Sequence, residues 1–405
     1  MKNTEAAVTI CAKNYFAKAK VLRQSYIDFH IGHTFYIVII DRKDSNFAAK
    51  YAEFNLIWLE DLDVANLYKH AFTYDIIEFS TNVKPSVLKL LLTKHNKVLY
   101  IDPDIKIYNH LKPVFDALDS HSIAITPHTL TPIMDGKHPN DIDFLKFGAY
   151  NLGFIGVSQV SEAFDFLSWW SSRCLAYGFY EPQLSLAVDQ KWIDLVPSYF
   201  STTKIMRDVG LNVSFWNLHE RFLSKKEGEW FVNNTAKLYF IHFSSFDSEN
   251  PTAIASKQNR FIKGDRPDVA ELYLGYALKL KAQDTGNYSA NIYSFDFFED
   301  GVYITAAMRR FYACLSERFS DEQNPFSATS KARLFGERKG LVSKKLKPMR
   351  RQDFKSMDDY ALQLKVIYFA LRIVLKVVGP VRYFALMRLL PQLSSIRNQE
   401  RVIGD

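Results

Sequence analysis

Two aspartates separated by a single proline form the most informative chemical motif in the sequence. The apolar run Val98–Ile101 is typical of a buried strand, and Asp102, Pro103 and Asp104 follow it directly. Open α/β sheets bind ligands beyond the carboxyl ends of their strands, so both carboxylates can face that crevice. Two hard oxygen donors at this spacing suit Mg²⁺ or Mn²⁺, which bind to one or two carboxylates together with substrate phosphates. A strand-terminal turn, in which Asp side chains cap backbone amides, is the structural alternative.

Polar side chains also lie beside three later apolar segments. Asn151 and Gly153 come just before a predicted strand, where glycine permits close approach and an amide can bind sugar hydroxyls as donor and acceptor. Asp189 and Gln190 place a carboxylate next to an amide, and His242 lies inside an apolar run. Taken singly, Asn151 and Gly153 also fit an ordinary turn, and Asp189 and Gln190 a solvated helix surface. His242 also fits a histidine packed in the core.

The order of these motifs, which spans roughly 145 residues, resembles that of the GT-A glycosyltransferases. Among them it is similar to glycosyltransferase family 8 and to related bacterial enzymes of lipopolysaccharide or capsule biosynthesis. The resemblance covers about residues 7–250 and implies a hexosyltransferase-like enzyme of class EC 2.4. In that family the aspartate pair chelates the divalent metal and the late histidine completes the site. This implies that Asp102, Asp104 and His242 are the ligands of Mn²⁺ or Mg²⁺.

The same resemblance implies a donor site. Asp189 and Gln190 correspond to catalytic positions beside the donor sugar, and Asn151 and Gly153 to positions that line it. Asp102 belongs to the nucleotide site as well as to the metal site.

Two earlier strand ends, which carry Asn14, Tyr15 and Asp41, match the region that holds the nucleotide base and ribose. The sequence departs from the family after His242, where Asn250-Pro251-Thr252 replaces the usual Lys-Pro-Trp. Lys84, at a predicted helix start, is a candidate cation for the diphosphate in its place, and an exposed lysine is the alternative.

The implied reaction moves a sugar from a nucleoside-diphosphate sugar, UDP by family resemblance, to a hydroxyl of a glycan or lipid-linked glycan. We expect retention, because the leaving phosphate can accept the acceptor proton. His128 follows the strand Ile123–Thr126 and is a candidate acceptor contact, as are Asp208 and His219 in mixed aromatic and polar segments.

Two other functions fit parts of the pattern. Haloacid-dehalogenase-type phosphatases also carry an Asp-x-Asp motif after a strand, but near the start of the chain and with Thr or Val where Lys106 stands here. A catalytically inactive sugar-nucleotide-binding or scaffold module would keep the pocket without turnover. Hydrolysis of nucleotide sugars with Mn²⁺, with and without EDTA, separates the three.

Short apolar runs that alternate with helical patterns must position these residues. Ala7–Ala12 and Phe35–Ile40 are predicted strands, and Phe16–Phe29 between them has helical spacing, which is typical of a βαβ unit in a parallel sheet. Helices are predicted from Lys84 and over Glu162–Tyr177, with a shorter one over Leu184–Ile193. A last strand is predicted over residues 238–243. The fold class is therefore α/β, with a Rossmann-like GT-A domain implied by the resemblance.

Composition and charge divide the chain of 405 residues. Residues 331–405 hold 17 Lys and Arg against 6 Asp and Glu, whereas the rest holds 34 against 38. We expect a catalytic domain over residues 1–255, a helical extension over 256–325, and a basic linker with amphipathic helices over 326–405. The mildly acidic body argues against a nucleic acid partner. Three widely spaced cysteines indicate neither a disulfide framework nor a zinc site.

The basic tail predicts contact with an anionic membrane surface. Lys365, Arg372 and Lys376 share one helical face of the segment Leu362–Val378, and Gly379-Pro380 ends that helix. A helical hairpin packed on protein is the alternative. No charge-free apolar run of about 18 residues and no signal peptide is recognisable, so a cytoplasmic protein, peripheral on the inner face of the cell membrane, is expected.

Overall fold

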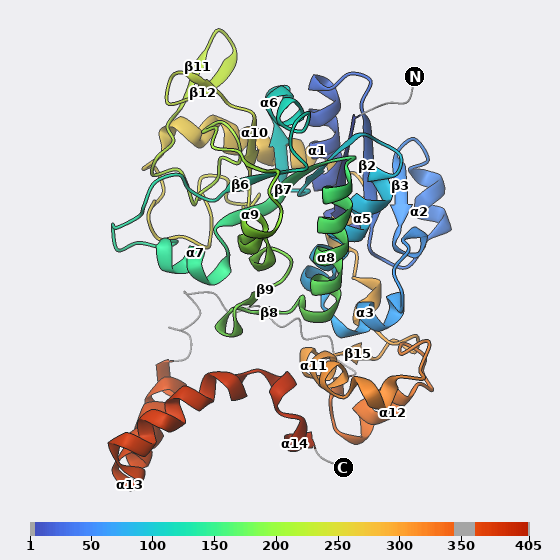
Figure 1. Ribbon diagram of the computed structural model, residues 1–405, viewed down its shortest axis with the longest axis vertical. Coiled ribbons are helices and arrows are strands. Elements are labelled where there is room, and N and C mark those ends of the chain that lie inside the picture. The colour runs from blue at the N-terminus through green and yellow to red at the C-terminus, as the bar shows by residue number, and fades with distance from the viewer. Residues whose placement is uncertain (1–4, 344–360, 404–405) are drawn as a thin grey trace. The chain divides into compact units, whose positions relative to one another are not determined.

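The computed structural model describes residues 5–343 and 361–403 and divides the chain into two compact units. The first unit comprises Met1–Leu67 and Ile76–Phe295, and the second comprises Tyr68–Asp75 and Asp296–Asp405 (Figure 1). The first unit thus extends past the expected domain boundary at residue 255, because helix α10 (Pro267–Gln283) packs against α1 (Phe16–Phe29).

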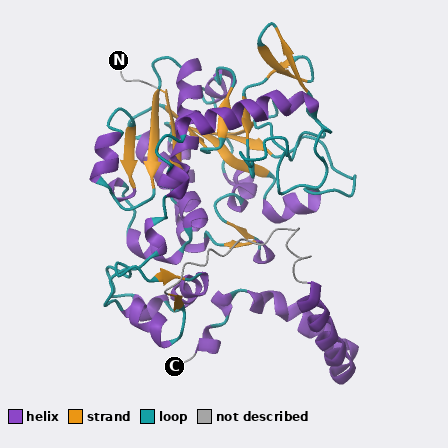
Figure 2. Ribbon diagram, turned by 180° about the vertical axis from the view of Figure 1, so that it is seen from behind, coloured by secondary structure: helices purple, strands orange, loops and turns teal. Residues whose placement is uncertain are grey.

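A seven-stranded sheet forms the centre of the first unit (Figure 2). Its spatial order is β10 (Thr203–Ile205), β6 (Ile123–Pro127), β7 (Tyr150–Ser158), β4 (Lys97–Ile101), β1 (Glu5–Cys11), β2 (Thr34–Ile39) and β3 (Asn55–Trp58). Only β7 among them runs antiparallel to its neighbours. The mixed α/β fold class expected from the sequence is confirmed.

Helices cover both faces of this sheet (Figures 1 and 2). The apolar side chains of α1 that recur at helical spacing are buried against the strands, as the sequence predicts. On the other face α5 packs against α8. The remaining helices of this unit are α2 (Ser45–Lys50), α4 (Ile76–Asn82), α5 (Lys84–Leu92), α6 (Lys112–Ala117), α7 (Asp141–Phe147), α8 (Ser161–Tyr177) and α9 (Val196–Tyr199).

Three small sheets complete the first unit. Strand β5 (Ile105–Ile107) pairs antiparallel with β14 (Phe240–His242). The others are formed by β8 (Tyr180–Glu181) with β9 (Leu186–Ala187), and by β11 (Leu223–Lys226), β12 (Glu229–Val232) and β13 (Ala236–Lys237). The prediction of a helix over Leu184–Ile193 is wrong, because this segment crosses from β9 into a short 3₁₀ turn, with Ser185 and Val188 in left-handed backbone conformations that break a helix.

Helix α3 (Leu67–Thr73), apart from its first residue, lies in the second unit. The buried Arg309 donates hydrogen bonds of 2.9 Å to the carbonyl oxygens of Ala71, Phe72 and Tyr74, which end this helix. The other elements of the unit are β15 (Tyr303–Ile304), α11 (Ala306–Cys314), α12 (Lys331–Arg338), β16 (Val342–Ser343), α13 (Ala361–Ser394) and α14 (Glu400–Ile403).

The expected linker is partly folded. Helix α12 lies inside it, with Ser330 as its N-cap and Ala332 and Phe335 buried. The sequence missed this helix because only a few apolar side chains interrupt its charged residues. The basic residues of the expected linker at 344–355 lie outside the described residues.

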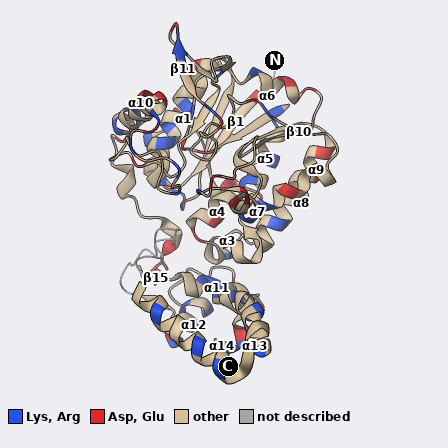
Figure 3. Cartoon of the chain, turned by 90° about the vertical axis from the view of Figure 1, so that its left-hand side faces the viewer, with Lys and Arg blue, Asp and Glu red and all other residues tan. Residues whose placement is uncertain are grey.

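Helix α13 is divided at Gly379, whose φ of 78° is not helical, as the Gly-Pro pair predicts. Lys and Arg recur along it without Asp or Glu (Figure 3). Four consecutive residues, Val366 to Phe369, are each at least 50% exposed, so apolar side chains point outward around most of the helix. The three basic residues form a narrow stripe on this helix, and its amphipathic, membrane-associating role stays a prediction. Among the described residues, none of the helices has the length and apolar character needed to span a membrane.

Candidate metal and donor site

Strand pairing brings the three predicted metal ligands together. Strand β4 ends at Ile101, and the turn through Asp102 and Asp104 leads directly into β5. In the antiparallel pair of β5 and β14, His242 lies opposite Ile105. The backbone N–H of Phe243 also donates to the carbonyl oxygen of Asp104 at 2.9 Å, which fixes the histidine beside the aspartate turn.

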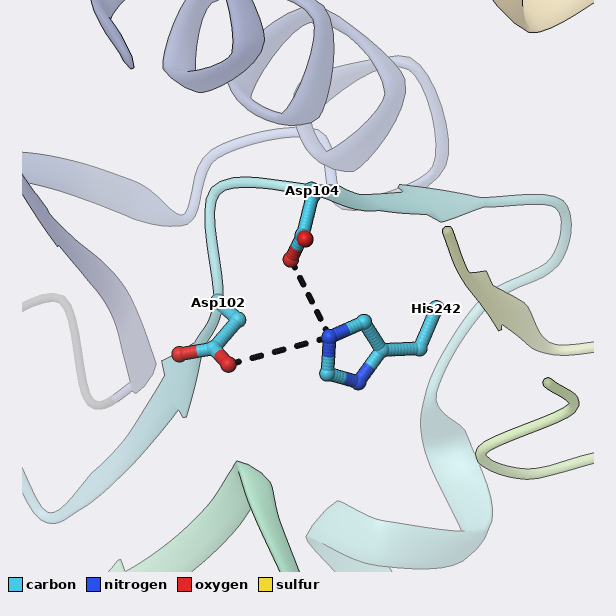
Figure 4. Close-up of side chains that lie close together, drawn as sticks. All are labelled: Asp102, Asp104 and His242. Atoms are coloured by element: carbon cyan, nitrogen blue, oxygen red, sulfur yellow. Dashed lines mark ion pairs between the residues drawn. The ribbon is translucent and has the colours of Figure 1, made fainter. Parts of the chain in front are cut away.

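The His242 Nε2 atom lies 3.1 Å from Asp104 Oδ1 and 3.7 Å from Asp102 Oδ2 (Figure 4). One ligand atom from each residue lies within 4.8 Å of the other two. Neighbouring ligands of an octahedral ion at about 2.1 Å are about 3 Å apart, so small side-chain movements suffice for one ion to bind all three. The two carboxylates suit Mn²⁺ or Mg²⁺, and the imidazole, a ligand typical of transition ions, favours Mn²⁺ of the two predicted metals.

The second nitrogen of His242 is held by Asn151. Asn151 Oδ1 lies 3.2 Å from His242 Nδ1 and accepts a bond of 3.2 Å from the Gly153 N–H. Because this oxygen only accepts, Nδ1 of His242 carries the proton and Nε2 keeps its lone pair for a metal. Trp216 packs edge-on against the same ring at 5.2 Å.

Gly153 leaves the space that this ring occupies. A Cβ atom there would lie 2.4 Å from Cε1 of His242 and 2.6 Å from Nδ1, closer than van der Waals contact allows. The sequence predicted that glycine admits a ligand, whereas in the structure it admits the imidazole. Asn151 is buried behind His242, so its contact with a donor sugar stays a prediction.

The electrostatics of the cluster follow from this geometry. Burial alone would lower the pKa of His242, but the carboxylates of Asp104 and Asp102 raise it. Burial would raise the pKa of Asp104, yet the imidazole and the charge of Lys18 bring it below its usual range. A metal would take the place of the proton shared by this pair, so metal binding is coupled to proton release.

A buried polar chain extends from Asp102 to Asp189. The Tyr100 hydroxyl donates to Asp102 Oδ1 at 2.6 Å, which leaves Oδ2 facing His242. The Lys84 ammonium lies 4.2 Å from the centre of the Tyr100 ring and 2.7 Å from Asp189 Oδ2, and it donates to the Leu152 carbonyl at 2.7 Å. Both partners of the Lys84–Asp189 ion pair have side chains only 2% exposed. The interpretation of Lys84 as an exposed lysine is therefore wrong, and it is not a free cation either.

Gln190 is tied to the backbone on both sides of its amide. Its Oε1 accepts from Leu152 N at 3.1 Å and its Nε2 donates to the Phe147 carbonyl at 3.0 Å. Val188, just before Asp189, has φ of 48°, a strained value for a β-branched residue. The pair predicted to be catalytic is thus held firmly, and the pKa of Asp189 is raised by burial.

The predicted nucleotide residues lie at the ends of β1 and β2. Asp41 is buried and accepts from the backbone N–H groups of Lys13 at 2.7 Å and Ser294 at 2.9 Å. Tyr15 is 43% exposed, and the Oδ1 atom of Asn14 is buried without a hydrogen-bond partner in the described part of the chain. Tyr15 is thus accessible to a ligand, whereas Asp41 holds backbone segments together. Nucleotide binding by these residues stays a prediction.

The three candidate acceptor residues lie in different surroundings. His128 is buried, stacks on Phe144 at 5.2 Å, and lies 3.3 Å from the Asn151 amide nitrogen through Nε2, so it is not a surface residue. Burial lowers its pKa to about 4. Asp208 caps a turn at the Gly210 N–H, and His219 lies near Thr131. In residues 5–343 and 361–403, no hydrogen bond or ion pair that the structure shows joins Asp208 or His219 to the metal ligands.

Sequence reasoning missed two residues of this site. Tyr100 was assigned only to a strand, although its position two residues before Asp102 places both side chains on one face. Lys18 was assigned only to helix α1, one turn after Tyr15, whose ring its ammonium contacts at 4.0 Å. Within the described residues Lys18 makes no ion pair, and its charge helps to lower the pKa of Asp104.

Comparisons with known proteins found relatives of undescribed activity. No family model matches the chain. Two uncharacterized Bacillus subtilis proteins are similar in sequence: YfnF is 26% identical over 277 residues, covering 67% of this chain and 90% of YfnF. YfnD is 22% identical over 265 residues, covering 63% of this chain and 80% of YfnD.

Solved structures with some similarity include three glycosyltransferases. The bifunctional enzyme WbbM has 13% identity and a TM-score of 0.43, with 70% of this chain matched to 52% of WbbM. The galactosyltransferase LgtC has 17% identity and a TM-score of 0.40 over 67% of this chain and 95% of LgtC. GlyE of Streptococcus pneumoniae has 14% identity and a TM-score of 0.40 over 73% and 66%. These scores lie below 0.5, and the functional argument rests on the site itself.

Proposed function

We propose that this chain is a metal-dependent glycosyltransferase. It would transfer a hexose from a nucleoside-diphosphate sugar, with UDP as the nucleotide, to a hydroxyl of a growing lipopolysaccharide or capsule glycan. The observation that carries the proposal is the convergence of Asp102 and Asp104 with His242, which lies 140 residues after Asp102 in the sequence. The motif order that resembles family 8 supplies the reaction class, since a metal site alone does not define one.

Departure of the diphosphate is the difficult event in this reaction. Mn²⁺ or Mg²⁺ held by the three ligands would supply Lewis-acid neutralisation of the diphosphate charge. Lys18 adds a nearby cation, and it takes the part first considered for Lys84, whose ammonium is already paired. Asp189 and Gln190 would hold the hydroxyls of the donor sugar. No separate base is needed if the leaving phosphate accepts the acceptor proton, so retention is the proposed outcome.

The test measures UDP release from several UDP-sugars with Mn²⁺, with and without EDTA. We expect turnover that EDTA abolishes, and a loss of about 10²–10³-fold in Asp102→Asn, because one charged ligand contributes several kcal/mol in the transition state. Asp119→Asn, at an exposed ion pair, is the matched control and should retain full activity. Equal turnover in Asp102→Asn, or turnover that resists EDTA, contradicts the proposal. Nucleotide-sugar binding without turnover would instead identify a scaffold module.

The tail would bring the enzyme to lipid-linked acceptors. Helix α13 combines exposed apolar side chains with five basic and no acidic residues, a composition that favours an anionic membrane surface. We expect the full chain to sediment with phosphatidylglycerol vesicles and to leave phosphatidylcholine vesicles unbound. A variant that lacks residues 361–405 should remain in the supernatant with both. Equal sedimentation of the two proteins contradicts this part of the proposal.

A further inference from the structure

A second concave region in the first unit lies between α1, β5, β12 and α10. Its volume is about 590 Å³, a size typical of small-molecule sites, and none of the metal or donor residues lines it. The side chains that matter for its chemistry are Gln24, Asp28, Lys106, Tyr108, Trp230 and Lys279.

Two lysines face this cavity without forming an ion pair in the described part of the chain. Neither Lys106 nor Lys279 makes an ion pair or hydrogen bond that the structure shows within the described residues. Of the acidic groups in the lining, Asp28 accepts from the Gln24 amide at 2.7 Å and Glu229 lies 3.3 Å from Lys237. Burial lowers the pKa of Lys106 to about 8. The charge of Lys279 also lowers it, and the smaller effect of Asp28 raises it. A half-buried cation that lacks a partner is costly unless an anion enters.

Aromatic side chains adjoin this cationic pair. The Lys106 ammonium lies 4.0 Å from the centre of the ring of Tyr108, the residue that directly follows β5. The Tyr108 hydroxyl oxygen is buried and has no hydrogen-bond partner in the part of the chain that the structure describes. Trp230 is half-buried and offers an apolar surface of the kind against which sugar rings pack.

We propose that this cavity binds a sugar ring that carries a carboxylate or a phosphate. Lys106 and Lys279 would pair with the charged group, and Trp230 would contact the ring. A neutral sugar would leave both cations unpaired, and a bare anion would leave the aromatic surface unused. That the charged ring belongs to the acceptor glycan rests on the proposed function, whereas the binding site itself does not.

The experiment titrates the full chain with glucuronic acid, glucose 6-phosphate, glucose and inorganic phosphate by isothermal calorimetry. We expect both charged sugars to bind and glucose not to bind. Lys106→Met should weaken the charged sugars by about tenfold or more, because a hydrogen bond to a charged group is lost. Lys279→Met changes an exposed residue and serves as a second variant that folds normally. Lys281→Met, on the same helix but outside the cavity, should bind as the unaltered chain does.

Three results would overturn the proposal. Equal affinity for glucose and the charged sugars would remove the role of the lysines. Inorganic phosphate that binds as tightly as glucose 6-phosphate would remove the sugar. Unchanged affinity in both Lys106→Met and Lys279→Met would place the ligand elsewhere. If the chain binds charged sugars here but transfers no sugar, only the proposed function fails. If it transfers sugar but does not bind charged sugars here, only the cavity proposal fails.

Discussion

Histidines lie at both ends of the parallel strands, and the surroundings of their rings differ. His242 lies at the carboxyl ends of the strands, with Nε2 facing two carboxylates that raise its pKa. His30 and His33 lie at the amino ends, where His33 pairs with Glu5 at 3.0 Å. His30 donates from Nδ1 to the Tyr26 carbonyl at 2.8 Å and accepts at Nε2 from the Leu111 N–H at 2.9 Å.

The two ends of the strands differ in how many ring nitrogens of the histidine are bound within the fold. Both nitrogens of His30 are used inside the fold, and burial lowers its pKa to about 3, so the ring is neutral and structural. His242 uses one nitrogen within the fold and directs the other at acidic oxygens. A buried histidine is thus a candidate metal ligand where its second nitrogen faces carboxylates, a distinction that its apolar sequence neighbours do not reveal.

The largest effect should come from removing the free nitrogen. His242→Gln is expected to weaken Mn²⁺ binding by about 10²-fold, since one of three protein ligands is lost. Electron paramagnetic resonance of free Mn²⁺ measures this directly. His30→Gln is the matched control, and its Mn²⁺ affinity should not change. Equal Mn²⁺ affinity in the two variants would contradict the distinction between His242 and His30.

A smaller effect concerns acid stability. Because the pKa of His30 is lowered from 6.5 to about 3, the unfolded state binds its proton first and stability falls as the pH drops below 6.5. This residue should contribute about 2 kcal/mol of lost stability at pH 5 relative to neutral pH. Urea unfolding of the unaltered chain and of His30→Gln at pH 7 and pH 5 tests the difference.

His30→Gln should reduce the drop in unfolding free energy between those two pH values, even though it also lowers stability at pH 7. His121→Gln, which replaces a half-buried histidine, controls for the substitution itself. An unchanged drop in His30→Gln would show that its neutral ring is not what acid disrupts.

The smallest effect should come from Tyr100→Phe, which tests how Asp102 is positioned at the carboxyl ends of the strands. Loss of the hydroxyl bond to Asp102 frees the carboxylate to rotate, and one such charged bond contributes about 1.5 kcal/mol or more. We expect roughly tenfold weaker Mn²⁺ binding by the same resonance assay, with thermal unfolding of the metal-free chain little altered. Equal affinity would mean that strand pairing alone positions Asp102.

The parts of the fold that repeat a simple pattern could be predicted. Strands β1, β2, β4 and β6 are apolar and short, α1 has helical spacing, and the Gly-Pro break in α13 is confirmed. The turn aspartates could be placed for the same reason, since they follow an apolar strand. Hidden elements lacked such patterns: β5 spans three residues, and α12 depends on its Ser330 cap.

The finer structure of the site could not be derived from sequence because it depends on pairing between distant segments. Gly153 was assigned to a ligand approach, but only the register of β14 against β5 reveals that the His242 ring fills its place. Lys84 carried no sign of its ion pair with Asp189, which lies 105 residues later. Lys18 was overlooked because one lysine on a helix carries no signal of its own.

The short pairing of β5 with β14 has a mechanical consequence. Three residues on each strand pair here, and the backbone N–H groups of Tyr108, Asn109 and Phe243 add hydrogen bonds across the same junction. An ion bound by Asp102 and Asp104 on one segment and by His242 on the other would stabilise this junction, because it would bind the folded chain and not the unfolded one. The thermal stability of the chain would then rise with the cation concentration through the same three side chains.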